Sequence, residues 1–377
     1  MSKIFVLAPD SFKESMTAIE ACQAMHAGIK SIFPDARFIY KPMADGGEGT
    51  IDALLFALNG EKIPATVTGP LPNQKIESYF GMIHSGQTAV IEMAKANGLD
   101  LLPSEQRNPL LTTTLGTGEL IRAALDYGAK KIIIGLGGSA TNDGGAGMAH
   151  ALGVRFYDQH GQNVALGGGY LHQTHTIDLS GLDPRLQHTD IVIASDVENP
   201  LIGKTGASHI FAPQKGATAA MVETLESNMQ HYAHCLTQQF QREFHHIAGS
   251  GAAGGLGAGL LAFTGAKIQS GVKTILEEID LEHAIAQADY VFTGEGGIDF
   301  QTQYGKTPLG VAKLAQQYHK PVFACAGYVG DGIDVLYDQG FTAIFGILDR
   351  SSDLKTACIN GQKNLQRTCE NIARVLK

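Results

Sequence analysis

Residues 4–20 read IFVLAPDSFKESMTAIE, and this stretch sets the pattern for both ends of the chain. The apolar run Ile4–Leu7 is short and ends in a Pro-Asp turn, as expected of a buried strand. Thr17 and Glu20 have the spacing of a capping box, which predicts a helix near residues 18–33. A strand that is followed at once by a helix is a βα unit, and it favours a parallel sheet.

Further units of this kind occur at both ends of the chain. The strands expected there cover residues 4–7, 38–40, 290–293, 322–326 and 343–347, and the additional helices lie near residues 50–58, 309–318, 333–339 and 353–375. Two strands from the N-terminal end and three from the C-terminal end predict a five-stranded, doubly wound parallel sheet. The fold class is therefore α/β.

The middle of the chain follows another pattern. Residues 61–93 carry closely spaced β-like runs with hairpin-type breaks, which indicate an antiparallel or mixed sheet. More strands and a long helix follow, at residues 131–134, 191–194 and 219–241. We therefore expect a second α/β domain inserted into the first, with a cleft between them. The expected boundaries are 1–65 plus 286–377 for the discontinuous domain and 66–285 for the inserted one.

Composition argues against several classes of function. The 377 residues include 28 Lys and Arg against 37 Asp and Glu, a net charge of −9, so no broad nucleic-acid-binding face is expected. The five cysteines lack CxxC spacing, which fits a reducing cytoplasm. The apolar run at the N-terminus is too short for a signal peptide or a membrane span. We expect a cytoplasmic protein with no membrane partner.

Five clusters of glycine and polar or charged residues stand at or near the ends of expected strands, where α/β sheets bind their ligands. The first cluster, APDSFKES, offers Asp10, Ser11 and Lys13 just before a helix N-terminus. This combination predicts an anion site with an added cation. An ordinary βα loop with a solvated lysine is the structural alternative.

The second cluster, MADGGEGT, places Asp45 and Glu48 on either side of Gly46 and Gly47. The glycines let backbone N–H groups approach an oxyanion closely, and the two carboxylates are candidate Mg²⁺ ligands. A simple turn with acidic residues at a helix start would give the same pattern, because the helix dipole favours negative charge there.

The third cluster, GLGGSATNDGGAGM at residues 135–148, is the most informative. It supplies many hydrogen-bond donors without positive charge, as a triphosphate cradle or an acid-binding loop requires. The candidate ligand-binding residues are Gly137, Gly138, Ser139, Thr141 and Asn142, and Asp143 is a candidate metal ligand. A dinucleotide fingerprint is the rival interpretation, because residues 135, 137 and 140 match GxGxxA. The TNDGG insertion before the helix argues against it.

The fourth cluster follows the strand at residues 191–194 and contains Asp196 and Asn199, with Gln214 and Lys215 downstream. An acid at the end of a strand with amide donors nearby is typical of a base or a metal ligand. A turn-capping aspartate would look the same in the sequence. The pattern alone leaves both interpretations open.

The fifth cluster, TGEGGIDFQTQYGKTP, contains the candidate metal ligands Glu295 and Asp299 and the candidate substrate-binding Lys306. Its GKT tail invites a P-loop interpretation. Walker A needs a glycine where this chain has Phe300, and the GKT at residues 203–205 fails in the same way.

Histidine spacing gives no support to a transition-metal site. His245 and His246 are adjacent, and His172 and His175 have a helix-like spacing. Neither pair has a further His or Cys in zinc-like register, so we expect solvated or hydrogen-bonded surface histidines.

The motifs together resemble those of the bacterial type I glycerate kinase family (glycerate 2-kinase). APDSFK, ADGGEGT, GLGGSATNDGGAGM, the stretch from ASDVENPL to FAPQKGA, GAAGGLGAGL and TGEGGIDFQT-xx-GKTPLGVA occur in the order and spacing of that family, over nearly the whole chain. The resemblance implies ATP and Mg²⁺ as cosubstrate and cofactor, D-glycerate as acceptor and 2-phosphoglycerate as product. It also implies a flavodoxin-like domain with a second α/β domain inserted. A homo-oligomer is compatible with it.

Roles for the charged residues follow from that chemistry. Lys13, Lys215 and Lys306 are candidates for the cation that meets the carboxylate of glycerate, and Lys13 is also a catalytic candidate. Asp196 is the candidate base. An NAD-type oxidoreductase and a ligand-sensing protein without turnover remain the rival functions, and titration with NAD(P) or an ADP-release assay distinguishes them.

Asp196→Asn tests the assignment of the base. We expect kcat to fall by about 10²- to 10⁴-fold, the usual contribution of a general base, with little change in ATP affinity. Steady-state kinetics measure both quantities. A variant that keeps more than roughly a tenth of wild-type kcat would show that the base is another residue.

Overall fold

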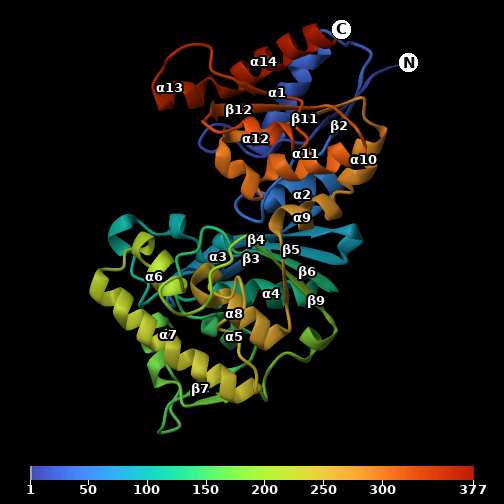
Figure 1. Ribbon diagram of the computed structural model, residues 1–377. Helices are drawn as coiled ribbons and strands as arrows, with labels where there is room; N and C mark the ends of the chain where they lie inside the picture. Colours follow the sequence, from blue (N-terminus) through green and yellow to red (C-terminus); the bar gives the residue numbers. More distant parts are fainter. Residues whose placement is uncertain (1) are drawn as a thin grey trace. The chain divides into compact units, whose positions relative to one another are not determined.

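The computed structural model describes residues 2–377 and contains two compact units, each built on its own sheet (Figure 1). The first unit comprises the described residues up to Asp45, Asp52–Asn59 and Val272–Lys377. The second comprises Gly46–Ile51 and Gly60–Gly271. The inserted domain expected from the sequence covers residues 66–285, whereas the second unit begins with the short segment Gly46–Ile51, resumes at Gly60 and ends at Gly271.

A five-stranded parallel sheet forms the centre of the first unit, in the order β13-β12-β11-β1-β2. Along the chain this order is 2-1-3-4-5, the flavodoxin-like arrangement, so the expected doubly wound sheet is confirmed. β1 pairs in parallel with both β2 and β11. The strands are β1 (Ile4–Leu7), β2 (Arg37–Tyr40), β11 (Tyr290–Ile298), β12 (Val322–Val329) and β13 (Ala343–Gly346).

Helices cover the sheet of the first unit. The expected capping box begins α1, where Glu20 N donates to Thr17 Oγ1 at 3.2 Å and Thr17 N donates to Glu20 Oε2 at 2.8 Å. α1 packs beside the C-terminal helix α14 (Figure 1). The helices are α1 (Ala18–Lys30), α2 (Thr50–Leu58), α9 (Gly271–Glu278), α10 (Leu281–Gln287), α11 (Thr307–Gln317), α12 (Asp334–Tyr337), α13 (Leu354–Ile359) and α14 (Gly361–Leu376).

The second unit is built on a six-stranded mixed sheet in the order β10-β9-β6-β5-β4-β3. β3, β4 and β5 pair antiparallel, as the hairpin-type breaks of residues 61–93 predict, and β5, β6, β9 and β10 run parallel. The strands are β3 (Glu61–Thr68), β4 (Lys75–Ile83), β5 (Thr88–Glu92), β6 (Lys131–Gly135), β9 (Asp190–Ala194) and β10 (Lys267–Gln269). β7 (Arg155–Tyr157) and β8 (Thr176–Asp178) form a separate pair.

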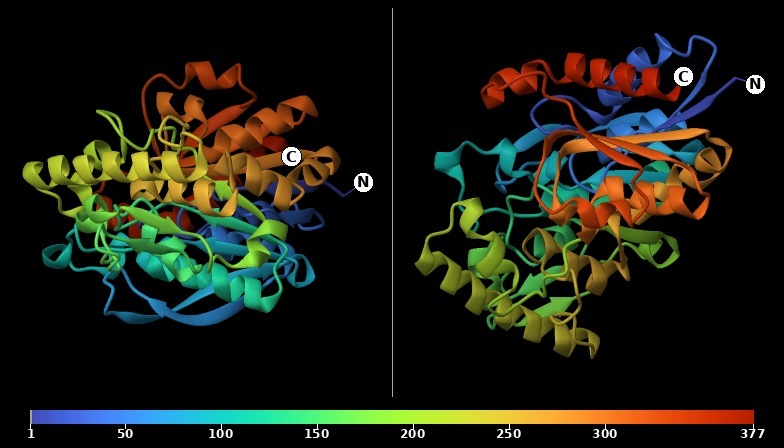
Figure 2. Two further views of the ribbon diagram at one scale, coloured as in Figure 1. Left: turned by 90° about the horizontal axis from the view of Figure 1, so that it is seen from below. Right: turned by 45° about the horizontal axis from the view of Figure 1, so that its top comes forward.

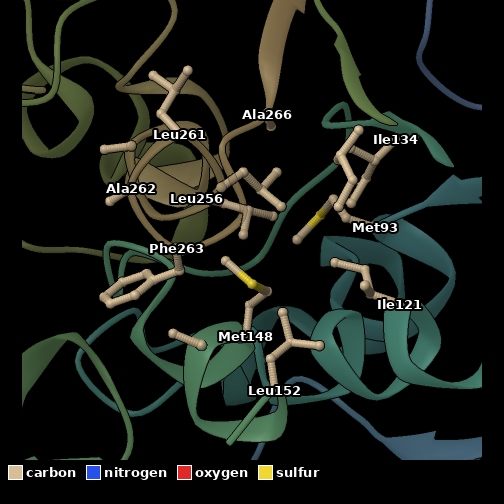
Figure 3. Close-up of a cluster of buried hydrophobic side chains, with 14 of the residues drawn as sticks. Met93, Ile121, Ile134, Met148, Leu152, Leu256, Leu261, Ala262, Phe263 and Ala266 are labelled. Atoms are coloured by element: carbon tan, nitrogen blue, oxygen red, sulfur yellow. The ribbon is translucent and has the colours of Figure 1, made fainter. Parts of the chain in front are cut away.

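The helices of the second unit enclose a large apolar core, in which Met93, Ile134 and Met148 meet residues of α8 (Figure 3). The long helix α7 stands out in both views of Figure 2. The helices are α3 (Ala94–Asn97), α4 (Leu115–Tyr127), α5 (Ala146–Ala151), α6 (Ala207–Phe211), α7 (Ala219–Phe240) and α8 (Ala252–Thr264). Across residues 2–377 no helix is long and apolar enough to cross a membrane.

Candidate active site

The first unit gathers carboxylates at its topological switch point, where the strand order reverses between β1 and β11. Asp10 follows β1, and its N–H donates to the carbonyl of Gly294 in β11 at 2.8 Å. Glu295 is the next residue of β11. The hydroxyl of Thr307, the first residue of α11, donates to Asp10 Oδ2 at 2.6 Å. Three segments that are far apart in the sequence therefore supply polar groups to one end of the sheet.

Burial makes these two carboxyls weaker acids. It raises the pKa of Asp10 to about 6, with a smaller contribution from the negative charge of Asp45, while the hydrogen bond from Thr307 acts in the opposite direction. It raises the pKa of Glu295 to about 7, where the positive charge of Lys306 opposes it and the charges of Asp10 and Asp45 add to it. The three carboxyls thus repel one another, so a cation among them would be stabilised.

Lys306 supplies one positive charge to this cluster. Its Nζ lies 3.3 Å from Glu295 Oε1 and donates to the carbonyl of Gly297 at 3.0 Å. Oε1 itself is buried and accepts no well-formed hydrogen bond from the described residues. Mg²⁺ prefers carboxylate oxygens, so Asp10, Glu295 and the exposed Asp45 are candidate ligands for it, and their oxygens would have to move closer together to share one ion.

The other candidates of the first unit differ in their surroundings. Lys13 is exposed in the loop before α1, and Ser11 N donates to Asp10 Oδ1 at 2.6 Å. Asp299 caps a 3₁₀ turn at residues 300–304, where Gln301 N donates to its Oδ1 at 2.9 Å. This capping contact gives Asp299 a structural role, and its contacts lend no support to its assignment as a metal ligand.

In the second unit, Gly46 and Gly47 pack against the ends of two strands. A Cβ on Gly46 would lie 2.6 Å from the carbonyl oxygen of Ala194, and a Cβ on Gly135 would lie 2.1 Å from the carbonyl oxygen of Gly46. Likewise, a Cβ on Gly137 would lie 3.0 Å from Gly47 Cα. These glycines are therefore needed because two backbones pack closely there. From the sequence alone, a glycine needed for such packing looks the same as one that opens the backbone to an anion.

The loop at residues 135–145 turns only a small part of its surface to solvent. Gly137 and Gly138 are exposed, whereas Ser139, Thr141 and Asn142 are buried. Asn142 Nδ2 donates to Ser208 Oγ at 3.1 Å, which uses one of its donors inside the protein. The part of the loop that is open to a ligand is therefore the backbone at Gly137 and Gly138.

Asp143 is fully buried and holds the loop to the start of α4. Its Oδ2 accepts from the backbone N–H groups of Thr114 and Gly147, at 2.8 and 3.2 Å, and its Oδ1 accepts from Gly145 N at 3.2 Å. Burial raises the pKa of Asp143, and these hydrogen bonds oppose that shift. The Thr114 hydroxyl also donates to Asp143, with its Oγ1 3.0 Å from Oδ2, so both oxygens are hydrogen-bonded inside the protein. The geometry favours a structural carboxylate over a metal ligand.

Lys215 is the buried cation that accompanies Asp143. Its Nζ donates to Ser139 Oγ at 2.9 Å and to the carbonyl of Thr141 at 2.7 Å. Burial lowers its pKa to about 7, and the negative charge of Asp143 opposes that shift. Its side chain is 1% exposed. Lys215 therefore braces the loop from inside, and as placed here it is not open to the carboxylate of a substrate.

The remaining candidates of the second unit lie nearer the surface. Asp196 is exposed just after β9, and Gln214 and Glu48 are exposed as well. Asn199 is half-buried, and its Nδ2 donates to the carbonyl of Thr205 at 2.8 Å. A solvent-exposed carboxylate at the end of a buried strand suits a base, so the interpretation of Asp196 remains a prediction.

A comparison with known proteins places the whole chain in one group. Residues 5–377 match the model of the glycerate kinase family. The chain belongs to this family. It is 48% identical to a "Glycerate kinase" of Haemophilus influenzae, over 99% of this chain and 98% of the relative, and 48% identical to a "Glycerate 2-kinase" of Escherichia coli, over 98% and 97%. A crystal structure of a protein assigned as glycerate kinase 2, from Salmonella typhimurium LT2, matches with a TM-score of 0.91 at 46% identity. That match covers 100% of this chain and 98% of the other.

Sequence reasoning missed two charged residues in this member of the glycerate kinase family. Glu92 ends β5 and is buried, and its Oε1 accepts from Ile51 N at 2.8 Å. Lys95 Nζ lies 3.7 Å from Glu92 Oε2, and although burial lowers the pKa of Lys95, the charge of Glu92 and a smaller contribution from Glu48 help to raise it overall. The sequence pattern that could have pointed to this pair is an acidic residue at the end of an apolar strand, followed three residues later by a lysine.

Asp143→Asn separates the structural role from metal binding. An asparagine amide would turn N–H groups toward backbone donors that now meet an oxygen, so we expect a loss of roughly 2–4 kcal/mol in the free energy of unfolding. Urea titration measures this, with Asp100→Asn at an exposed position as the control. The Mg²⁺ concentration for half-maximal activity should stay unchanged. A large rise in that concentration without loss of stability would instead identify Asp143 as a ligand.

Proposed function

We propose that the protein transfers the γ-phosphoryl group of ATP to a hydroxyl of D-glycerate, giving 2-phosphoglycerate and ADP. The observation that carries this proposal is the family match over residues 5–377. Relatives at 48–49% identity bear the names glycerate kinase and, in one case, glycerate 2-kinase, which supports the 2-position as the site of transfer.

The carboxylate cluster of the first unit supports a role for Mg²⁺. Asp10, Asp45 and Glu295 would hold the ion, and the buried Oε1 of Glu295, which now faces Lys306 Nζ at 3.3 Å, would be one of the ligand atoms. When bound, Mg²⁺ would neutralise negative charge on the phosphates. Without it, the repulsion among the three carboxyls is met only in part by Lys306.

Residues beside the cluster suit the binding of phosphate. α11 begins at Thr307, where the helix dipole places positive partial charge, although Pro308 has no N–H and Leu309 N already donates to the carbonyl of Lys306 at 3.0 Å. Lys306 precedes that helix and adds a positive charge. Phosphoryl transfer depends mainly on positioning and charge neutralisation, so a helix N-terminus, a lysine and oxygen ligands for Mg²⁺ form a sufficient set for the nucleotide.

Asp196 remains the proposed base in the second unit. Its carboxylate would orient the attacking hydroxyl and accept its proton, and the rigid end of β9 would fix its position. The exposed backbone of Gly137 and Gly138 and the exposed Lys13 are the proposed contacts for the substrate's charged groups. Lys215 would act from inside the protein by supporting the glycine loop.

The dinucleotide interpretation is disfavoured by the same glycine loop. In a GxGxxA fingerprint the second glycine lets the backbone approach a pyrophosphate. Here the second glycine is Gly137, and the Cα of Gly47 lies 3.0 Å from where a Cβ on Gly137 would be, so the backbone of Gly47 takes up part of that space.

An ADP-release assay with a panel of hydroxy acids tests the proposed function. We expect turnover with ATP, Mg²⁺ and D-glycerate, and ³¹P NMR of the product should show phosphate at the 2-position. The oxidoreductase and ligand-sensing alternatives both predict no ADP release under these conditions. Release of ADP with a different hydroxy acid alone would keep the kinase assignment and reject glycerate.

Glu295→Gln tests the metal site. Removing one charged ligand should raise the Mg²⁺ concentration for half-maximal activity by at least about ten-fold. Asp299→Asn, at the neighbouring turn cap, is the matched control and should leave that concentration nearly unchanged.

The pH dependence gives an independent check in the wild type. Protonation of Glu295 and Asp10, whose pKa values are about 7 and about 6, removes metal ligands, so Mg²⁺ activation at subsaturating Mg²⁺ should weaken as the pH falls from 8 to 6. An unchanged Mg²⁺ requirement in Glu295→Gln and a flat pH profile would place the metal elsewhere.

A further inference from the structure

The loop between α7 and α8 is held firmly at several points. Phe244 is buried, and its ring meets that of Phe240 edge to face with centroids 5.7 Å apart. Ile247 N donates to the carbonyl of Phe244 at 3.2 Å, and Leu201 N donates to the carbonyl of His245 at 3.1 Å. The side chains next to Phe244 are therefore displayed from a well-anchored backbone.

Three potential metal ligands extend from this anchored loop. Glu243, His245 and His246 each offer a ligand atom, and these atoms lie within 4.8 Å of one another. Among residues 2–377 this is the one group of three or more His, Cys, Asp or Glu side chains that meets this distance. The two imidazole rings have centroids 4.1 Å apart, although their residues are adjacent in the sequence.

One nitrogen of this group lacks a hydrogen-bond partner. Nδ1 of His245 is buried and has no hydrogen-bond partner among the described residues. Glu243 and His246 are exposed, so their side chains are free to adjust.

We propose that Glu243, His245 and His246 form a binding site for Zn²⁺ or a similar transition-metal ion, separate from the carboxylate cluster of the first unit. Imidazole nitrogen is a good ligand for Zn²⁺ and a poor one for Mg²⁺, and the carboxylate completes a His₂Glu set with water in the fourth position. Bond lengths of about 2.0–2.1 Å place tetrahedral ligands roughly 3.4 Å apart. The side chains therefore need to close by at most ~1.4 Å from the distance in this structure.

The proposed metal site is hydrogen-bonded to a segment that contains Asn199, a candidate substrate-binding residue. Besides the bond from Leu201 to His245, Gly251 N donates to the carbonyl of Asn199 at 3.0 Å. The loop is thus tied on both sides to Asn199–Leu201, which follows Asp196. Metal occupancy would stiffen this segment further.

The test uses untagged, EDTA-treated protein, because a histidine tag would itself bind metal. Titration with Zn²⁺ against a chromophoric chelator should give one ion per chain, with a dissociation constant on the order of 1 μM, weaker than four-ligand structural sites. Millimolar Mg²⁺ should not compete. Co²⁺ in place of Zn²⁺ should give the visible absorption of a site with imidazole ligands.

Variants at the exposed ligands decide the assignment. Glu243→Gln and His246→Gln should each weaken Zn²⁺ binding by at least about ten-fold, the size of effect seen even for groups that only support a ligand. His175→Gln, from the other histidine pair, is the matched control and should bind like the wild type. Absence of stoichiometric Zn²⁺ binding in the wild type, or equal binding in all three variants, overturns the proposal. These measurements need neither ATP nor glycerate, so they stand apart from the proposed kinase activity.

Discussion

The backbone of Gly46 lies against the ends of β6 and β9 so closely that no side chain fits between them. The carbonyl of Gly46 occupies the place where a Cβ on Gly135 would be, and the carbonyl of Ala194 crowds the Cα of Gly46 in the same way. Within the same unit, Glu92 at the end of β5 accepts the N–H of Ile51 at 2.8 Å. The position of the loop that follows β6 depends on this packing.

That constraint changes the meaning of the glycine-rich motifs. Glycines beside polar residues are typical of anion sites, because N–H groups can then approach a ligand. In this protein several of them instead let one backbone approach another, and the exposed part of the third cluster shrinks to Gly137 and Gly138. The same residue type thus serves packing at one position and remains available for binding at the next.

The two units differ in how far the charge of their carboxylates is compensated by neighbouring groups. In the second unit Asp143 receives backbone hydrogen bonds on both oxygens and has the positive charge of Lys215 nearby, so its charge is compensated internally. In the first unit Asp10 and Glu295 are half-buried near Asp45, and the positive charge of Lys306 opposes the raised pKa of Glu295 only in part. A compensated carboxylate stabilises a loop, whereas an undercompensated group of carboxylates has a reason to bind a cation.

The sequence by itself determined the fold class and the family. Parallel strands are buried on both faces, so runs such as Ile4–Leu7 and Lys131–Gly135 are recognisable without a structure, and the capping box of Thr17 is a local signal. The motif order identified the glycerate kinase family, which the comparison confirmed. The tertiary structure alone decided which polar residues are exposed. Asp143 and Asp196 have similar sequence contexts after a strand, yet one is enclosed by α4 and the other faces solvent. Burial and hydrogen bonding depend on segments distant in the chain, such as Thr114 for Asp143 and Thr307 for Asp10, and no local pattern encodes those contacts.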